Sequence, residues 1–223
     1  MTEPVSPSAG WGILHLFCKP SASFDAEAVV AAVKAIRAAD HQVVTAAMLG
    51  HKCDMAFVGL GPDLRVLRRL QSSLQAAGLE VVDSYVSITE VSEYAKSLPA
   101  EMLTPRLYPV LPPEGKPAFC FYPMSKKREP QANWFTLPFD ERSALMHEHG
   151  TSGRKFAGRL TQLITSSTGL DDFEWGVTLF GVHPDDLKDA VYTMRFDTAS
   201  ALYGEFGRFY AGYVTDVEDL VAR

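Results

Sequence analysis

The chain has 223 residues, and its length, composition and charge exclude several classes of protein. With 47% hydrophobic and 22% charged residues it can bury a sizeable core, and no apolar run approaches the roughly 18 residues that span a bilayer. The formal net charge of −6 argues against nucleic acid or a membrane as a partner, because phosphate binding needs a basic face. The three cysteines form no C-x-x-C pair, so we expect neither disulfides nor structural zinc, and a cytoplasmic location.

The first half of the chain is predicted to alternate strands and helices. Residues 1–10 are expected to form a disordered leader, and they lack the basic flank and apolar stretch of a secretory signal. Apolar residues at helical spacing predict helices over 25–39 and 64–77, the second closed by Gly78. Strands are predicted over 12–19, 41–49, 55–60 and 80–89. The order β-α-β-β-α-β is that of the split βαβ unit.

Six prolines in residues 97–117 predict a linker, and beyond it the same order returns. The expected strands cover 118–126, 162–167, 173–181 and 209–215, and the expected helices cover 140–159 and 184–206. We therefore predict an α+β fold with two ferredoxin-like βαββαβ units, residues 11–96 and residues 118–223. The antiparallel sheets, flanked by helices, are expected to pack face to face in the manner of a dimeric α/β barrel.

Familiar catalytic motifs are absent from the sequence. We find no G-x-S-x-G, no Walker A motif, no H-E-x-x-H and no G-x-G-x-x-G that opens a helix. The stretch between Tyr122 and Ser200 is nevertheless dense in tyrosine, tryptophan, histidine and arginine. Any site is therefore expected in the second half.

His149 is the first candidate within that stretch. It lies two residues from His147 on a predicted helix, so the two side chains face different directions and cannot easily share a metal. A lone helix histidine is more often solvated or part of the core than a ligand. Gly150 and Gly153 follow, however, and glycine within a helix costs roughly 1 kcal/mol relative to alanine. Close approach by a flat ligand is one reason to accept that cost.

Basic residues and one tyrosine are the other candidates. Arg195 follows an amphipathic helix, and an arginine among apolar neighbours requires a carboxylate or phosphate partner. Tyr122 ends the apolar strand AFCFY; it is either a core tyrosine with a hydrogen-bonded hydroxyl or a redox tyrosine beside an oxidant such as a haem. The remaining basic residues of the group, which a solvated face would also explain, are Arg106, Lys126, Lys127, Arg128 and Arg154.

Several long motifs carry a resemblance to a known family. They are CFYPMSKKR, NWF-x-LP, LM-x-EHG-x-x-GR, TGLDDFEWGVTLF, VY-x-MRFD and YGEFG-x-FY. From about residue 11 to residue 215 the chain resembles the chlorite dismutase-like superfamily, and within it the branch of coproheme decarboxylases. The resemblance implies a pair of ferredoxin-like units per subunit, assembly as a homopentamer, and transient contact with ferrochelatase.

The resemblance also assigns roles to individual residues. It implies that His149 binds the haem iron, that Tyr122 is redox-active and that Lys126 attends a reacting propionate. Propionate partners by the same comparison are Arg106, Arg195, Ser200 and Tyr85. Gln162 lies where chlorite-degrading members carry a distal arginine, and an uncharged amide cannot hold chlorite as a guanidinium can.

The implied activity is the oxidative decarboxylation of iron coproporphyrin III (coproheme) to haem b. Hydrogen peroxide is the expected oxidant, two propionates become vinyls, and a ferryl species draws an electron and a proton from Tyr122. The resulting tyrosyl radical would take hydrogen from the propionate. Three alternatives stay open: a chlorite dismutase, a dye-decolourising or catalase-like peroxidase, and a haem-binding carrier.

Overall fold

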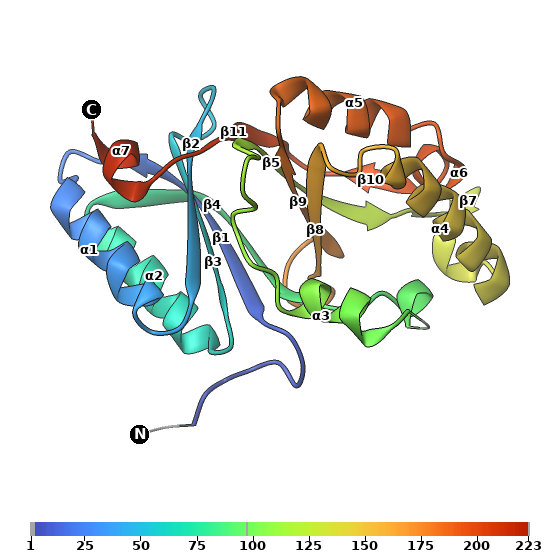
Figure 1. Cartoon of the computed structure of the whole chain (residues 1–223), viewed down its shortest axis with the longest axis horizontal. Helices are drawn as coiled ribbons and strands as arrows, with labels where there is room; N and C mark the ends of the chain where they lie inside the picture. The colour runs from blue at the N-terminus through green and yellow to red at the C-terminus, as the bar shows by residue number, and fades with distance from the viewer. Residues whose placement is uncertain (1–2, 97, 223) are drawn as a thin grey trace.

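The computed structural model describes residues 3–96 and 98–222, and nine of its strands form one closed antiparallel sheet (Figure 1). Strands β6 (Arg128–Glu129) and β7 (Ala132–Asn133) pair separately as a short hairpin. The order in the closed sheet is β10-β5-β11-β2-β3-β1-β4-β8-β9, and β9 pairs again with β5, so the sheet closes on itself. The strands of this sheet are β1 (Gly12–Pro20), β2 (Gln42–Met48), β3 (Met55–Gly61), β4 (Leu79–Thr89), β5 (Ala118–Lys126), β8 (Leu160–Ser166), β9 (Trp175–Gly181), β10 (Gly204–Phe206) and β11 (Tyr210–Val214).

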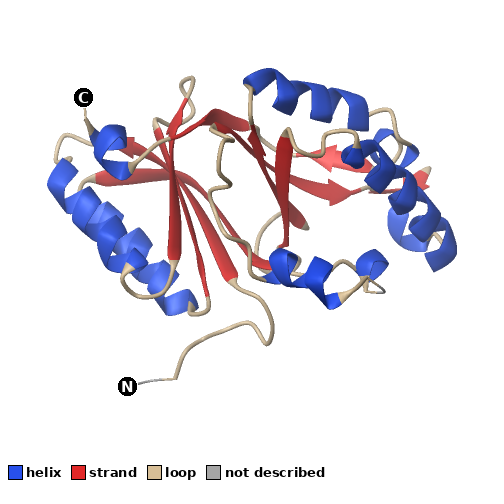
Figure 2. Cartoon of the chain, viewed as in Figure 1, coloured by secondary structure: helices blue, strands red, loops and turns tan. Residues whose placement is uncertain are grey.

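Helices cover the outside of this sheet on both halves (Figure 2). Their bounds are α1 (Ala26–Arg37), α2 (Leu64–Ala76), α3 (Ala100–Leu107), α4 (Phe139–Arg154), α5 (Pro184–Met194), α6 (Thr198–Ala201) and α7 (Val217–Val221). Within each half the strands lie in the same relative order, β4-β1-β3-β2 in the first and β11-β5-β9-β8 in the second. The predicted pair of ferredoxin-like units is therefore confirmed, and Gly78 ends α2 with a positive φ of 81° as expected.

The expectation of two sheets that only pack face to face is incomplete, because their edges also pair. Gly212 of β11 pairs with Met48 of β2, and Ile88 of β4 pairs with Ser166 of β8. An open sheet edge exposes unpaired N–H and C=O groups, and joining the two sheets at both edges removes those groups from solvent.

The predicted continuous helix over 184–206 is wrong in its second half. Helix α5 ends at Met194, and Asp197 then caps the short helix α6 by accepting a hydrogen bond from the Ser200 amide at 2.9 Å. After α6 the chain forms β10, whose Gly204 pairs with Lys126 of β5. Asp197, in the middle of the predicted helix, therefore marks the point where the chain turns back toward the sheet.

The segments predicted as leader and linker have contacts of their own. The Val5 amide donates to Asp63 Oδ1 at 3.2 Å, and the Leu64 amide donates to the Val5 carbonyl, so residues 3–10 run against the start of α2. Helix α3 forms within the proline-rich segment after Pro99 and includes Pro105. Residues 1–2 of the expected leader and residue 97 of the expected linker lie outside the described residues.

The apolar core is unequally divided between the two halves. In the first half α1, α2 and α7 bury a continuous apolar layer on the outer face of the sheet, including Val33, Leu70 and Leu220. The interior of the closed sheet holds a second cluster around Phe121 and Phe180. The outer face of the second half has a smaller cluster, and this is where the covering layer is incomplete.

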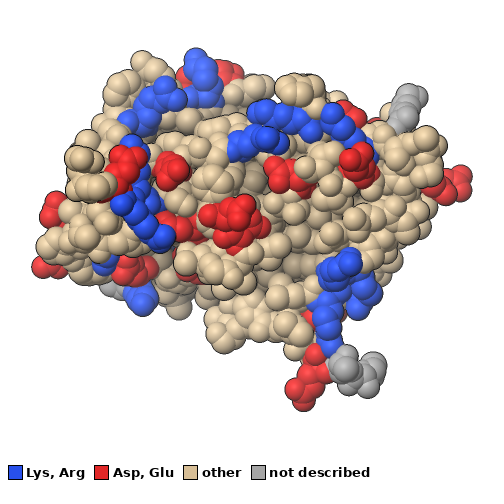
Figure 3. Space-filling model, turned by 180° about the vertical axis from the view of Figure 1, so that it is seen from behind, with Lys and Arg blue, Asp and Glu red and all other residues tan. Residues whose placement is uncertain are grey.

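Charges are mixed on the surface of the molecule. The rear face shows acidic and basic side chains in small separate groups with wide uncharged areas between them (Figure 3). Across residues 3–96 and 98–222, no helix has the length and apolarity needed to cross a bilayer.

Candidate active site

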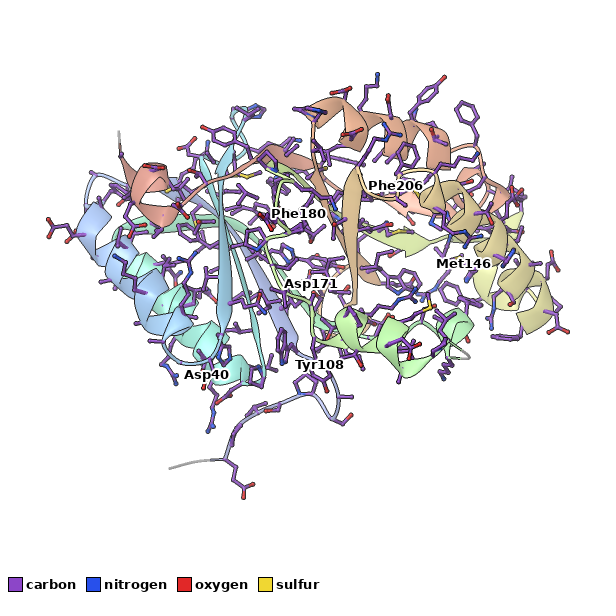
Figure 4. The ribbon with its side chains drawn as sticks, in the orientation of Figure 1. Asp40, Tyr108, Met146, Asp171, Phe180 and Phe206 are labelled. Atoms are coloured by element: carbon purple, nitrogen blue, oxygen red, sulfur yellow. The ribbon has the colours of Figure 1, made fainter. Side chains whose placement is uncertain are left out.

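Helix α4 covers the second half without burying a side chain. None of its 16 residues is buried, whereas α1 buries Val29, Ala32, Val33 and Ile36. Most helical stability in proteins comes from packing an apolar face, so a helix with no buried residue is held weakly by its own chain. Figure 4 shows Met146 on the side of α4 that is turned toward the sheet. The face of α4 that is turned toward the sheet is therefore available to a ligand.

The two glycines of α4 are not required by packing within the protein. A Cβ at Gly150 would meet only the Arg154 guanidinium, at 3.7 Å, and a Cβ at Gly153 would meet only the end of Met194, at 3.7 Å. Both are ordinary contact distances, so alanine would fit at either position. The cost of a mid-helix glycine is thus unexplained by the described contacts, and a ligand that lay against the helix would explain it.

A cavity lies between α4, α5 and the outer face of the sheet. Tyr122 of β5 and Gln162 of β8 flank the central strand β9, opposite Val177 and Leu179, and both line the cavity. The cavity has a volume of about 20 Å³, little more than one water molecule needs, whereas a ligand pocket typically holds about 300–1,000 Å³. A large flat ligand therefore requires α4 to move outward. The other lining residues are Gly153, Phe156, Leu160, Ala190, Val191 and Met194.

Tyr122 is a buried phenol that packs between two aromatic rings. Its ring stacks on Phe209 at 4.4 Å between centroids and meets Phe206 edge-on at 5.8 Å. No hydrogen bond to its hydroxyl is found in the part of the chain that the structure describes, in contrast to the ordinary core tyrosine. Burial raises the pKa of Tyr122 far above its usual value, so the phenol stays protonated and can be oxidised only by losing a proton with the electron.

His149 is held at one ring nitrogen and open at the other. Its Nδ1 lies 2.9 Å from the carboxylate of Asp197 and 3.4 Å from the hydroxyl of Ser200. A carboxylate only accepts, so Nδ1 carries the proton and Nε2 has a free lone pair. This is the arrangement that orients a histidine ligand and raises its basicity toward a metal.

Lys126 is a buried lysine in a polar and aromatic surround. Its ammonium donates to the Ala199 carbonyl at 2.8 Å and lies 4.6 Å from the Trp134 ring centroid. Burial lowers the pKa of Lys126 to about 8, although the negative charges of Asp197 and Glu174 oppose that change. A carboxylate brought next to the ammonium would therefore stabilise its charged form.

These residues converge because of their spacing on the elements. Tyr122 and Lys126 are four residues apart on β5, so they lie on the same face of the strand, about 13 Å apart. His149 and the cavity-lining Gly153 are four apart on α4 and so share a helix face. Helix α6 connects the two groups, since Ser200 contacts His149 and Ala199 contacts Lys126.

Three residues predicted to bind propionates are not brought to this group. Arg106 is exposed on α3. Arg195 is exposed rather than set among apolar neighbours, because it ends α5, and its guanidinium lies 5.8 Å from the ring of the half-exposed Tyr192. Tyr85 points into the closed sheet, where its hydroxyl bonds to Ser167 Oγ and donates to the Phe173 carbonyl at 3.2 Å.

Three residues that the sequence analysis did not select support the site. Asp197 holds His149 and caps α6, and Trp134, 3% exposed, lies beside the Lys126 ammonium. Glu174 accepts from the Lys126 amide at 3.0 Å and pairs with Arg128, fixing the end of β5. The motif MRFD could have pointed to Asp197, because it places an acidic residue, a preferred helix-capping type, shortly after the end of α5. No comparable pattern in the sequence points to Glu174.

The donor set fits an iron porphyrin that bears carboxylates. An oriented imidazole nitrogen suits the iron, the glycine face of α4 suits a flat ring, and the buried ammonium of Lys126 suits a carboxylate. The phenol of Tyr122 lines the cavity together with Gly153 of α4, whereas His149 and Lys126 lie outside the cavity lining.

Comparisons with known proteins show the family to which the chain is related. A family model for chlorite dismutase matches residues 23–215. A coproheme decarboxylase of Thermus thermophilus is 45% identical over 181 residues, which cover 78% of this chain and 72% of that protein. A coproheme decarboxylase of Staphylococcus saprophyticus is 40% identical over 183 residues, which cover 77% and 72%. A protein of Natronomonas pharaonis named as heme-binding is 43% identical, but the chain spans only 31% of its length.

Solved structures show the same architecture. A heme-binding protein from Thermus thermophilus superposes with a TM-score of 0.85 at 36% identity, covering 99% of this chain and 98% of that one. A chlorite dismutase variant from Candidatus Nitrospira defluvii superposes with a TM-score of 0.77, covering 96% and 95%. At 16% identity the second likeness shows the fold alone.

Proposed function

This chain belongs to the chlorite dismutase family, and we propose that it is an oxidoreductase that decarboxylates coproheme to haem b with hydrogen peroxide. The observation that carries the proposal is the cavity that Tyr122 and Gln162 both line. It combines a buried phenol, which has no hydrogen bond among the described residues, with an uncharged amide. Relatives named coproheme decarboxylase at 40% and 45% identity support the same conclusion.

The iron belongs to the substrate, and when bound it supplies the reaction of peroxide and the one-electron chemistry. His149 would bind that iron through Nε2, with Asp197 holding the ring in orientation through Nδ1. The face of α4 that carries Gly150 and Gly153 would lie against the porphyrin plane. Ser200, which contacts His149, lies close enough to the same edge to meet a propionate.

Tyr122 and Lys126 would act on the propionate itself. Tyr122 would give one electron to the peroxide-oxidised substrate and its proton to water at the cavity, and its neutral radical would then take a hydrogen atom from the propionate carbon next to the ring. The second electron of the oxidation would pass to the oxidised substrate as carbon dioxide leaves. Lys126 balances the carboxylate that leaves as carbon dioxide, and its buried setting strengthens that interaction. Each propionate that becomes a vinyl and carbon dioxide releases two electrons and a proton, so each needs one peroxide.

Gln162 distinguishes this function from chlorite degradation. It lines the cavity opposite Tyr122, and an amide stabilises a small oxyanion less than a guanidinium does. A carrier would need His149 and cationic groups, but it would not need a buried phenol in the same cavity as the ligand.

One mixing experiment tests the proposal. The protein is loaded with iron coproporphyrin III, titrated with peroxide, and its pigment separated by mass. Two successive decarboxylations, complete near two equivalents of peroxide, are expected. An unchanged porphyrin would establish the carrier instead, and rapid, sustained oxygen release from chlorite would establish a chlorite dismutase.

Replacing His149 with alanine is expected to weaken binding of iron coproporphyrin and to slow its reaction with peroxide. The substitution removes the only imidazole that Asp197 orients among the described residues. Resonance Raman spectra of the complex measure the iron–imidazole stretch, which should disappear. The exposed His147, two residues away, provides the matched control His147→Ala, which should leave the stretch unchanged.

Coproheme binding is expected to protect the amides of α4 from hydrogen exchange more than those of α1. Helix α4 buries no residue and therefore opens at low cost in the free protein, whereas α1 is anchored by four buried side chains. Exchange measured by mass spectrometry with and without coproheme gives the comparison. Equal protection of the two helices would mean that the ligand does not lie against α4.

Assembly and location are further parts of the proposal. We propose that the protein is a homopentamer in the cytoplasm. We also propose that it contacts ferrochelatase transiently. Exposed apolar side chains such as Leu49, Val110 and Tyr213 offer surface for contacts between copies. Light scattering tests the assembly: a mass near that of one 24.5 kDa chain would contradict it.

A further inference from the structure

A chain of aromatic rings crosses the interior of the closed sheet, behind the strand that carries Tyr122. Tyr210 stacks on Phe17 with 3.8 Å between centroids and 13° between planes. Phe17 lies 5.4 Å from Phe121, which in turn lies 4.2 Å from His15 and 5.3 Å from Tyr85. These five rings belong to the same buried layer as Phe180, labelled in Figure 4 between the two halves of the molecule.

Tyr210 is the member of this cluster whose phenol has a base as its partner. Its hydroxyl donates to the carboxylate of Asp83 in a short hydrogen bond, while the ring itself is 3% exposed. The carboxylate of Asp83 is 41% exposed and lies 4.0 Å from the Arg208 guanidinium. A phenol becomes a strong acid when it loses an electron, so a bonded carboxylate makes that loss easier by taking the proton.

Tyr210 is also linked to Tyr122 through both neighbouring strands. In the β5–β11 pairing Phe121 lies opposite Tyr210, and Phe121 directly precedes Tyr122 in the chain. On the outer face Tyr122 stacks on Phe209 at 4.4 Å, and Phe209 directly precedes Tyr210. The two tyrosines therefore lie on opposite faces of the sheet, separated by one strand pairing.

We propose that Tyr210 is a second redox-active residue, which reduces the Tyr122 radical when no oxidisable propionate lies beside it. The step rests on the proposed function, with hydrogen peroxide as the oxidant that first oxidises Tyr122. Tyr210 gives one electron to the Tyr122 phenoxyl and its proton to Asp83; Tyr122 regains its O–H bond with a proton from water in the cavity. The oxidising equivalent then rests next to solvent instead of damaging the porphyrin.

The other interior tyrosine does not meet the same conditions. The hydroxyl of Tyr85 bonds to the Ser167 hydroxyl and to the Phe173 carbonyl, neither of which takes up a proton at neutral pH. The described contacts therefore single out Tyr210 as the tyrosine of this cluster with a proton acceptor.

Protein loaded with haem b provides the test, because both reactive propionates are gone and a radical on Tyr122 has no substrate. The protein is mixed with one equivalent of peroxide, frozen within milliseconds and examined by high-field EPR. The g-tensor of a tyrosyl radical reports whether its oxygen accepts a hydrogen bond. We expect a hydrogen-bonded signal in the wild type, from Tyr210 beside protonated Asp83.

Variants assign the signal. Tyr210→Phe keeps the ring stack on Phe17 and should replace the signal by one with a different g-tensor, from a radical on Tyr122, with more porphyrin bleached per peroxide. Asp83→Asn, at an exposed position, should do the same with the phenol intact. Tyr213→Phe is the matched control on the same strand, half exposed, and should leave the signal unchanged.

Two failures can be told apart. If iron coproporphyrin is decarboxylated but Tyr210→Phe leaves the radical signal and the bleaching unchanged, the role of Tyr210 is overturned and the proposed function stands. If the wild type forms no tyrosyl radical with either porphyrin, both are overturned.

Discussion

Phenylalanine in place of Tyr122 is expected to abolish the formation of haem b while leaving the fold and coproheme binding nearly unchanged. The ring keeps its stack on Phe209, and the lost hydroxyl has no hydrogen-bond partner among the described residues, so stability should change by less than about 1 kcal/mol. Burial keeps the phenol protonated by raising its pKa, so the electron and the proton must leave together, and phenylalanine has no such proton.

The measurement is chromatography of the pigment after two equivalents of peroxide. The Tyr122→Phe protein should still react with peroxide at the iron, yield neither the mono-vinyl intermediate nor haem b, and bleach its porphyrin. Tyr192→Phe on α5, a half-exposed tyrosine outside the cavity, controls for the loss of a phenol in general. Haem b at near wild-type yield from the Tyr122 variant would remove that residue from the reaction.

The fold was largely predictable because its signals are local. Apolar spacing over α1 and α2 and the alternation in β1 and β5 identify the elements, and their order identifies the ferredoxin-like unit. The pairing of β11 with β2 and of β4 with β8 joins residues more than 70 positions apart, which no local pattern reports. The same limit hid β10, whose pairing with β5 depends on the turn that Asp197 begins.

The elements that carry the candidate site residues were predictable from local patterns. His149, Tyr122 and Lys126 lie on elements that the sequence identifies, and their spacing fixes the face on which each one lies. The expectation that Arg195 lies among apolar neighbours was wrong, because α5 ends at Met194 and leaves the Arg195 side chain exposed. The orientation of Tyr85 into the closed sheet follows from the register of β1 with β4, which only the structure gives.

The two halves share a fold but differ in what covers their sheets. In the first half apolar residues of α1, α2 and α7 fill the outer layer, whereas the glycines of α4 and its lack of buried residues leave that layer open in the second. A second site of the same kind in the first half is therefore excluded by packing among the described residues. Both halves therefore have the same scaffold, and the cavity lies in the second half.

Decarboxylation is expected to lose rate as pH rises through about 8, because Lys126 loses its charge there. Its ordinary pKa of 10.5 is lowered to about 8 by burial, so the ammonium that faces the leaving carboxylate is neutralised between pH 7 and pH 9, where an exposed lysine stays charged. The charged fraction falls about tenfold over that range, and kcat/KM, which reports the free enzyme, should fall with it.

Two variants separate Lys126 from every other group that titrates in this range. Lys126→Met keeps the apolar stem against Trp134 but has no charge, so kcat/KM should be low at pH 7 and independent of pH up to pH 9. Lys126→Arg keeps a charge that does not titrate, so any activity it retains should also be flat across this range. Since His149 and Tyr122 are the same in all three proteins, a decline with pH that survives in both variants would assign the titration to another residue and leave Lys126 a merely structural role. A decline confined to the wild type would place the positive charge of Lys126 beside the carboxylate at the moment when its carbon–carbon bond breaks.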